Sequence, residues 1–299
     1  MKLLFIYNPE SGKGKIVKEL PFIKAYLKEK GFLTTIKRTT KVSDAYNFAK
    51  TSQSYKMVLV AGGDGTINEV VNGLMELKEK PLLGYIPTGT VNDVGYLIGM
   101  SKNIKKSLKI IFEEAFFKKL DITKINDKYF LYVGATGIFT KSSYDLKRSD
   151  KKRFGALAYF MRGSKELFKD YKMAVDIKYD GGRIRGPYSL LLFLNGPRVG
   201  GFKLKRLKSY LDDGLIEGRF FKREPGMLLR LFGFFITRGR YNTSKNTTFR
   251  SSEFLVEIDK DSEWNIDGEY AFKGSAVLTV QKKALIVAVN KKRKKMFSS

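Results

Sequence analysis

The sequence predicts an α/β domain with a mostly parallel sheet, followed by a largely β domain. Up to about residue 121, short apolar runs alternate with stretches of helical apolar spacing. Beyond that point, apolar runs of strand length follow one another, separated by glycine and polar clusters. A chain of 299 residues has room for two medium domains. We therefore expect domains at 1–121 and 122–299, and the last segment could return to the first domain.

The first domain should contain four strands, each followed by a helix. The expected strands cover 2–7, 33–38, 57–60 and 82–87, and the helices 16–29, 44–49, 67–74 and 104–116. The second domain should contain strands at 129–133, 174–179, 189–194, 215–221, 254–258, 264–266, 276–280 and 285–289, and a helix at 154–168. The strand count suggests a sandwich-like domain. The basic segment 291–295 should form a frayed end.

Composition narrows the chemistry. The chain has no cysteine and no histidine, so acid–base work falls to Asp, Glu, Lys or Tyr, and a hard cation with oxygen ligands is the metal class left open. Its net charge of +27 favours an anionic partner, although lysines spread over a solvated surface would also explain it. No apolar run reaches the roughly 18–20 residues of a membrane span, and the N-terminus is a predicted strand. We expect a cytoplasmic protein, at most peripheral at the inner face of the membrane.

The segment 61–69, Ala-Gly-Gly-Asp-Gly-Thr-Ile-Asn-Glu, is the central functional feature. It lies where a buried strand ends in glycines and a helix begins, which is the arrangement of a phosphate site. Asp64 would repel a bare phosphate, so it favours an intervening Mg²⁺ or water. By itself such a loop could also be a tight turn without a ligand.

Two further polar loops should reach the same edge of the sheet. Residues 8–14 follow the first strand and residues 88–93 follow the fourth. Ligands of parallel sheets bind at the carboxyl ends of strands, so the three loops should converge on one site.

Asp267 and Glu269 form a second acidic feature. If they alternate along one strand, both carboxylates point to one face, and two close like charges raise the pKa of one of them. The alternative is a hairpin turn with exposed acids. Asp212-Asp213-Gly214 by itself is an ordinary turn.

Taken in order, these motifs resemble the diacylglycerol kinase catalytic family, bacterial lipid kinases related to sphingosine kinases and, more distantly, to NAD kinases. The matching stretches are 8–12, 62–69, 87–93, 211–214 and 267–270. The resemblance implies ATP and Mg²⁺ as cofactors, with the active site in the cleft between an α/β and a β-sandwich domain. It assigns ATP binding to Asn8, Pro9, Glu10, Ser11, Gly12, Thr40, Gly63, Asp64, Gly65, Thr66, Ile67, Asn68, Glu69 and Thr90.

The resemblance also implies the remaining roles. Glu269 would be the general base. Asp64, Asp93, Asp121 and Asp267 would form an acidic network that reaches the catalytic Mg²⁺ through water. Asp213, with the backbone oxygens of Tyr210 and Leu215, would hold a structural Mg²⁺.

The expected function is phosphorylation of the hydroxyl of diacylglycerol to give phosphatidic acid. Phosphatidylglycerol, a sphingoid base or NAD are alternative acceptors. A lipid-sensing or nucleic-acid-binding protein on this fold is the alternative from another functional class. Of these partners, we do not expect nucleic acid. An anionic membrane surface is the expected partner, and a homodimer stays open. The segment 226–240, short, apolar and flanked by basic residues, could rest in the membrane interface or pack on the β domain.

Overall fold

The computed structural model describes residues 1–138, 172–204, 207, 209–239 and 246–298. The helix predicted at 154–168 lies outside these residues. The chain forms two compact units, one of residues 1–121 with 283–299 and the other of residues 122–282. Strands β5 (Ala115–Ile125) and β17 (Ala276–Asn290) carry the chain from one unit to the other. The first unit is α/β and the second is largely antiparallel β, which confirms the predicted fold class.

The first unit is built on a parallel sheet with the strand order β17-β4-β3-β1-β2. Its elements are β1 (Lys2–Tyr7), α1 (Lys15–Glu29), β2 (Leu33–Arg38), α2 (Asp44–Ala49), β3 (Met57–Gly62), α3 (Asp64–Met75), β4 (Leu82–Pro87), α4 (Asp93–Leu97) and α5 (Ile104–Lys109). A π turn, Ile110–Glu114, ends the predicted helix 104–116 early, and β5 begins at Ala115.

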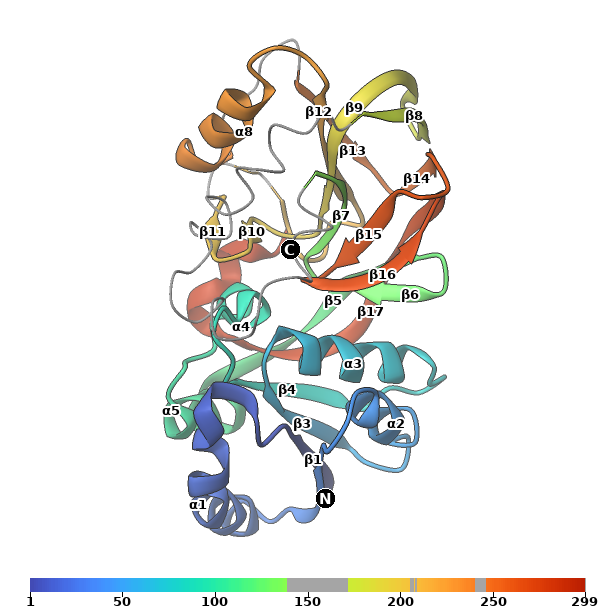
Figure 1. Cartoon of the computed structure of the whole chain (residues 1–299). Helices are drawn as coiled ribbons and strands as arrows, with labels where there is room; N and C mark the ends of the chain where they lie inside the picture. Colours follow the sequence, from blue (N-terminus) through green and yellow to red (C-terminus); the bar gives the residue numbers. More distant parts are fainter. Residues whose placement is uncertain (139–171, 205–206, 208, 240–245, 299) are drawn as a thin grey trace. The chain divides into compact units, whose positions relative to one another are not determined.

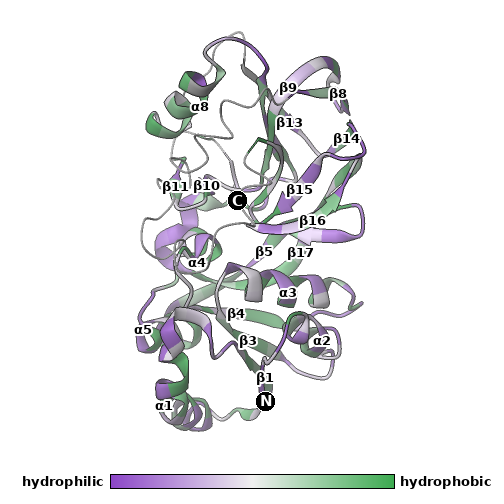
Figure 2. Ribbon diagram, viewed as in Figure 1, coloured by the Kyte–Doolittle hydropathy of each residue, from purple (hydrophilic) through white to green (hydrophobic). Residues whose placement is uncertain are grey.

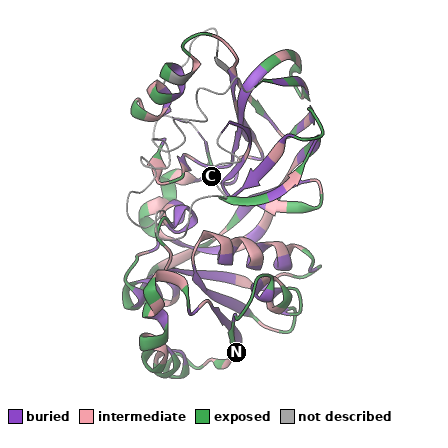
Figure 3. Ribbon diagram, in the orientation of Figure 1, coloured by how far each residue is buried: buried purple, intermediate pink, exposed green. Residues whose placement is uncertain are grey.

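The order of the strands reverses between β1 and β3. Right-handed crossovers then put α1 on one face of this sheet and α2 and α3 on the other (Figure 1). With both faces covered, β1, β3 and β4 are apolar and buried almost throughout, as Figures 2 and 3 show. Such a reversal point is where open α/β sheets bind their ligands.

The second unit is organised around antiparallel strands in the order β16-β15-β7-β9-β8-β14-β17, with β12 also paired to β9 and β13 to β12. Its elements are β6 (Lys128–Phe130), β7 (Val133–Gly137), β8 (Met173–Tyr179), β9 (Gly182–Leu194), β10 (Arg198–Val199), β11 (Phe202–Lys203), β12 (Ile216–Lys222), α8 (Met227–Ile236), β13 (Asn246–Ser251), β14 (Glu253–Glu257), β15 (Glu263–Ile266) and β16 (Glu269–Lys273).

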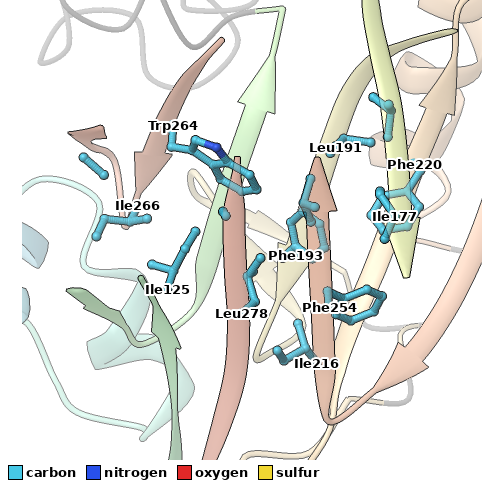
Figure 4. Close-up of a cluster of buried hydrophobic side chains, with 14 of the residues drawn as sticks. Ile125, Ile177, Leu191, Phe193, Ile216, Phe220, Phe254, Trp264, Ile266 and Leu278 are labelled. Atoms are coloured by element: carbon cyan, nitrogen blue, oxygen red, sulfur yellow. The ribbon is translucent and has the colours of Figure 1, made fainter. Parts of the chain in front are cut away.

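An aromatic core fills this unit (Figure 4). The ring of Phe193 lies 5.2 Å from those of Phe220 and Phe254 and 5.7 Å from that of Trp264, centroid to centroid. The indole nitrogen of Trp264 donates to the carbonyl oxygen of Gly274 at 2.8 Å, so its one polar atom is satisfied inside the core.

Four more predicted elements differ from the structure. The strands expected at 276–280 and 285–289 are one strand, β17, and the strand expected at 129–133 is divided into β6 and β7. The prediction of a frayed basic end is wrong. Residues Lys291–Met296 form a 3₁₀ helix, the Arg293 guanidinium lies 4.3 Å from the centre of the Tyr96 ring, and Phe297 is buried.

Candidate active site

Three loops of the first unit meet where β1, β3 and β4 end. A Cβ atom on Gly12 would lie 2.0 Å from the carbonyl oxygen of Thr88, and one on Gly89 would lie 2.6 Å from the Cα atom of Gly63. On Gly63 it would lie 3.8 Å from the hydroxyl oxygen of Ser11. The predicted convergence of the three loops is therefore present within this unit, and glycine is required at its closest approaches.

Hydrogen bonds fix the backbone of these loops. Asn8 donates from its side-chain amide to the hydroxyl of Thr66 at 3.2 Å. The buried hydroxyl of Tyr85 donates to the carbonyl oxygen of Gly62 at 3.1 Å, and the Asn92 side chain donates to the carbonyl oxygen of Gly89 at 2.6 Å. The loops are thereby held in place before any ligand binds.

Two carboxylates lie within this network. One carboxylate oxygen of Asp64 accepts the backbone N–H of Val94 at 3.3 Å, and Asp93 is completely buried. Burial raises the pKa of Tyr85 well above its usual value, and the negative charges of Asp64 and Asp93 raise it further. Both aspartates therefore act on one buried hydroxyl.

Of the two aspartates, the partly buried Asp64 fits a cation held through water, whereas Asp93 has no surface that water could reach. Within the described residues no three Asp, Glu, His or Cys side chains are grouped so that they could ligate a metal directly. An outer-sphere Mg²⁺, with most of its own waters retained, needs only one or two carboxylates besides the substrate phosphates.

Several predicted nucleotide residues serve the fold through their side chains. The side chain of Ile67 lies in the core, so only its backbone could reach a ligand. The two carboxylate oxygens of Glu69 accept the N–H groups of Ser43 and Ala45 at 3.1 and 3.2 Å, which ties α3 to the start of α2.

Thr40 and Asp121 are also engaged. The N–H and hydroxyl groups of Thr40 donate to Asp44 at 2.7 and 2.8 Å, and these bonds hold the pKa of Asp44 below its usual value. Asp121 accepts the N–H of Lys283 at 2.7 Å, where β17 has a positive φ. Pro9 is buried, Asn68, Ser11 and Gly65 are partly buried, and Glu10 and Thr90 are exposed on the loops.

Asp267 differs from the prediction of alternating strand acids. Ile266 pairs with Glu269, so Asp267 and Gly268 are a two-residue hairpin loop, with φ values of 50° and 91°. Positive φ at both central residues is typical of a type I′ turn, for which Asp-Gly is a preferred sequence. The alternation on one strand is wrong. The hairpin of the alternative is present, but of its two acids only Glu269 is exposed.

The hairpin exposes one acid and buries the other. Asp267 is only 2% exposed, and its carboxylate accepts the backbone N–H groups of Leu131, Tyr132 and Val133 at 2.8, 3.0 and 3.1 Å. These bonds divide the strand predicted at 129–133. Glu269 is exposed at the first position of β16. Asp267 is thus a positioning residue for the turn that presents Glu269.

Comparison with known proteins agrees with these motifs. The family model for the diacylglycerol kinase catalytic domain matches residues 2–125. A diacylglycerol kinase of Staphylococcus saprophyticus is 34% identical over 277 residues, covering 90% of this chain and 88% of its own. The chain belongs to the diacylglycerol kinase family. The diacylglycerol kinase of Bacillus subtilis is 31% identical, with 89% of this chain and 88% of that protein covered.

A solved structure gives the same assignment. A diacylglycerol kinase from Bacillus anthracis strain Sterne superposes with a TM-score of 0.81 at 26% identity, over 97% of this chain and 98% of that one. Membership of the diacylglycerol kinase family confirms the predicted class of enzyme, a lipid kinase. None of the described helices has both the length and the apolar character needed to cross a bilayer.

The structural Mg²⁺ that the diacylglycerol kinase resemblance implies at Asp213 meets a competing cation. One carboxylate oxygen of Asp213 accepts from the Arg250 guanidinium at 2.5 Å, and the other accepts the N–H of Leu215 at 3.1 Å. A divalent cation and a guanidinium repel each other on one carboxylate. As they stand, these residues fit an ion pair better than a metal. The metal set of Tyr210, Asp213 and Leu215 stays a prediction.

Sequence reasoning missed the residues whose side chains fix the backbone of the loops after β3 and β4 by hydrogen bonds. The sequence pattern predicts Tyr85 only as part of a buried strand, although a tyrosine on such a strand needs a partner for its hydroxyl. Asn92, at φ 57°, bonds to Gly89 and accepts from Tyr85 at 3.4 Å. An asparagine just before a helix is a recognisable signal for such a conformation.

Proposed function

We propose that this protein transfers the γ-phosphoryl group of ATP to the free hydroxyl of diacylglycerol, giving phosphatidic acid and ADP. The hydroxyl oxygen bonds to the γ-phosphorus as the bond from that phosphorus to the bridging oxygen of the β-phosphate breaks. The hydroxyl proton passes to the carboxylate of Glu269. Family membership supports the reaction class, and the three converging glycine loops carry the proposal for the nucleotide.

The nucleotide phosphates would bind to the loops of the first unit. Gly63 precedes α3 with an extended backbone, so the first N–H groups of that helix point out of its N-terminus. Their partial positive charge suits phosphate oxygens. Asp64, which is partly exposed, would keep Mg²⁺ near these phosphates through water, and the buried Asp93 would add negative charge behind it. When bound, Mg²⁺ would neutralise the charge that develops as phosphate is transferred.

Glu269 is the best candidate for the base. The chain contains no histidine, and among its remaining acid–base side chains a carboxylate, ionised at neutral pH, is the natural proton acceptor. Glu269 is exposed, whereas the carboxylate of the nearby Asp267 is occupied by hydrogen bonds from three backbone N–H groups. The rigid turn keeps the Glu269 backbone in place, which lowers the entropy lost on reaching the transition state.

The acceptor is tested by lipid phosphorylation in mixed micelles with labelled ATP. Diacylglycerol, phosphatidylglycerol, ceramide and NAD are offered separately at equal concentration, with and without Mg²⁺. We expect label in phosphatidic acid, and none when Mg²⁺ is chelated. Label in another acceptor alone would replace diacylglycerol by that acceptor. No transfer to any of them, together with salt-dependent DNA binding, would reject the kinase proposal.

A further inference from the structure

Helix α8 of the second unit carries two different faces. Its buried face packs on the β unit: Leu231 and Phe234 are buried, the Phe234 ring lies 5.7 Å from that of Phe221 in β12, and the Phe235 ring lies 4.8 Å from that of Phe202 in β11. The helix is therefore attached firmly to the sheet, and its other face is held outward.

The outward face is apolar. Leu229, Phe232 and Ile236 are 75%, 47% and 61% exposed. Their spacing of three and four residues puts them on one side of the helix. Figure 2 colours much of α8 as apolar, and Figure 3 shows exposed residues along the same helix beside partly buried and buried ones. A contiguous apolar face of this kind on a folded protein indicates an interaction surface.

Cations border this face. Lys203 and Arg238 line a hollow of about 340 Å³ together with Phe235 and Ile236. Neither the segment 225–239 nor the segment 196–204 contains an aspartate or glutamate. Glu224, just before the helix, lies 3.9 Å from the guanidinium of Arg230. The two segments that form this surface, in the part of the chain that the structure describes, thus combine apolar side chains with positive charge and contain no acid.

We propose that the α8 face, made of Leu229, Phe232, Ile236, Lys203 and Arg238, docks on an anionic phospholipid bilayer. The apolar side chains enter the boundary between headgroups and acyl chains, and the two cations meet lipid phosphates. A helix of ten residues is only about 15 Å long, so it lies in the plane of the leaflet and does not cross it. A protein partner would need acidic groups placed opposite these two cations. An anionic bilayer carries negative phosphates over its whole surface, so it needs no such placement.

The docking proposal rests on the proposed function in one respect: a lipid substrate is what would bring the protein to a membrane. Vesicle binding is measured without ATP or diacylglycerol, so either proposal can fail alone. The α8 variants should also keep their turnover of a short-chain diacylglycerol dispersed in water and lose turnover on vesicles. Loss of both activities in a folded variant would instead place α8 in the catalytic machinery and overturn the docking proposal.

The first experiment is co-sedimentation with vesicles of phosphatidylcholine alone or mixed with phosphatidylglycerol, at low and high salt. We expect binding only to the anionic vesicles. The double change Leu229→Ser with Ile236→Ser should weaken it roughly 10- to 100-fold by removing apolar burial. Lys203→Gln with Arg238→Gln should weaken it about 10- to 30-fold at low salt and less at high salt.

Matched controls come from the first unit. Leu33 is 70% exposed, so Leu33→Ser removes a similar apolar side chain from another surface. Lys24→Gln with Lys28→Gln removes two exposed charges in the same way. Thermal unfolding checks that each variant is folded. If the controls weaken binding as much as the α8 changes do, binding is due to overall charge and the proposal is rejected.

A second experiment uses the absence of cysteine from the chain. Leu229→Cys, labelled with an environment-sensitive fluorophore, should shift to the blue on anionic vesicles, and labelled Leu33→Cys should not. An unchanged Leu229→Cys signal from sedimented protein would show that another surface binds. A lipid-free dimer that Leu229→Ser dissociates would assign the face to a second copy of the chain and overturn the proposal.

Discussion

Gly89 approaches Gly63 so closely that a Cβ atom on Gly89 would lie 2.6 Å from the Cα atom of Gly63. The loop after β4 therefore rests directly on the loop after β3, backbone against backbone. This contact couples the two loops that would surround the nucleotide phosphates. It also makes the two glycines unequal, because a Cβ atom on Gly63 would meet Gly89 at an ordinary 3.5 Å.

Gly89→Ala should therefore destabilise the first unit, and Gly63→Ala should not. We expect Gly89→Ala to lower the free energy of unfolding by about 1–3 kcal/mol, because the added methyl group forces two backbones apart. Gly63→Ala, the matched control, should unfold within about 0.5 kcal/mol of the wild type. Urea denaturation measures both. Equal stability of the two variants would contradict the close approach.

Asp267→Asn should lower stability. The amide keeps one acceptor oxygen and introduces a donor toward N–H groups, so the three bonds to Leu131, Tyr132 and Val133 cannot all remain. We expect a loss of about 2–4 kcal/mol in the free energy of unfolding, measured by denaturation. The exposed neighbour gives the comparison: Glu269→Gln should not change stability. A stable, inactive Asp267→Asn protein would instead assign Asp267 a role in catalysis.

The acid stability of the second unit should depend on Asp176. Hydrogen bonds from Arg183 lower its pKa from 3.8 to about 2, and Arg185 opposite it on β9 contributes as well. Because the pKa is lower in the folded state, the stabilisation is complete above pH 3.8 and is lost as the pH falls through about 2.

Asp176→Asn should thus be less stable than the wild type above this window, and the two unfolding curves should approach each other as the pH falls toward its lower end. Fluorescence-detected denaturation at a series of pH values measures the difference. Asp127→Asn, which changes an exposed aspartate of the same unit, serves as the control. A difference that stays constant through the window would exclude this ion cluster as its source.

Because Arg250 is paired with Asp213, the stability of the second unit should not depend on Mg²⁺. The Arg250 guanidinium contacts Asp213 at 2.5 Å and the buried Glu217 at 3.5 Å. Glu217 on β12 is the residue that pairs with Arg250 on β13. Burial raises the pKa of Glu217, and Arg219 and Arg250 oppose this rise.

We expect the unfolding temperature of the wild type to be the same in EDTA and in Mg²⁺. Arg250→Gln should lose about 1–3 kcal/mol of stability because two carboxylates lose a shared cation. Mg²⁺ should restore part of that loss. Calorimetry measures all four conditions. A wild type that EDTA destabilises in the second unit would favour the metal at Tyr210, Asp213 and Leu215 over the ion pair.

The features predicted well were those with local causes. The loop around Asp64 was recognisable because a buried strand, three glycines and a helical pattern follow one another within a short stretch. The same holds for the parallel sheet, whose strands are continuous apolar runs. In each case neighbouring residues carry the information.

The features predicted badly depend on partners far away in the chain. The direction of Asp267 is determined by backbone N–H groups 134 to 136 residues earlier, which no local pattern reveals. The polar run at 281–283 reads as a break, yet β17 continues through it with Lys283 bonded to Asp121. The contact of Asp213 with Arg250 likewise depends on a distant strand, β13, whose register places Arg250 opposite Glu217 of β12.

Glu269→Gln tests the central claim most directly. The change keeps the size of the side chain and removes the proton acceptor. Phosphatidic acid formation from ATP and diacylglycerol should fall by about 10²- to 10⁴-fold, while ATP affinity and unfolding temperature stay at wild-type values. Glu257→Gln, exposed on β14, should remain fully active. A folded Glu269→Gln protein that forms phosphatidic acid at the wild-type rate would contradict the account.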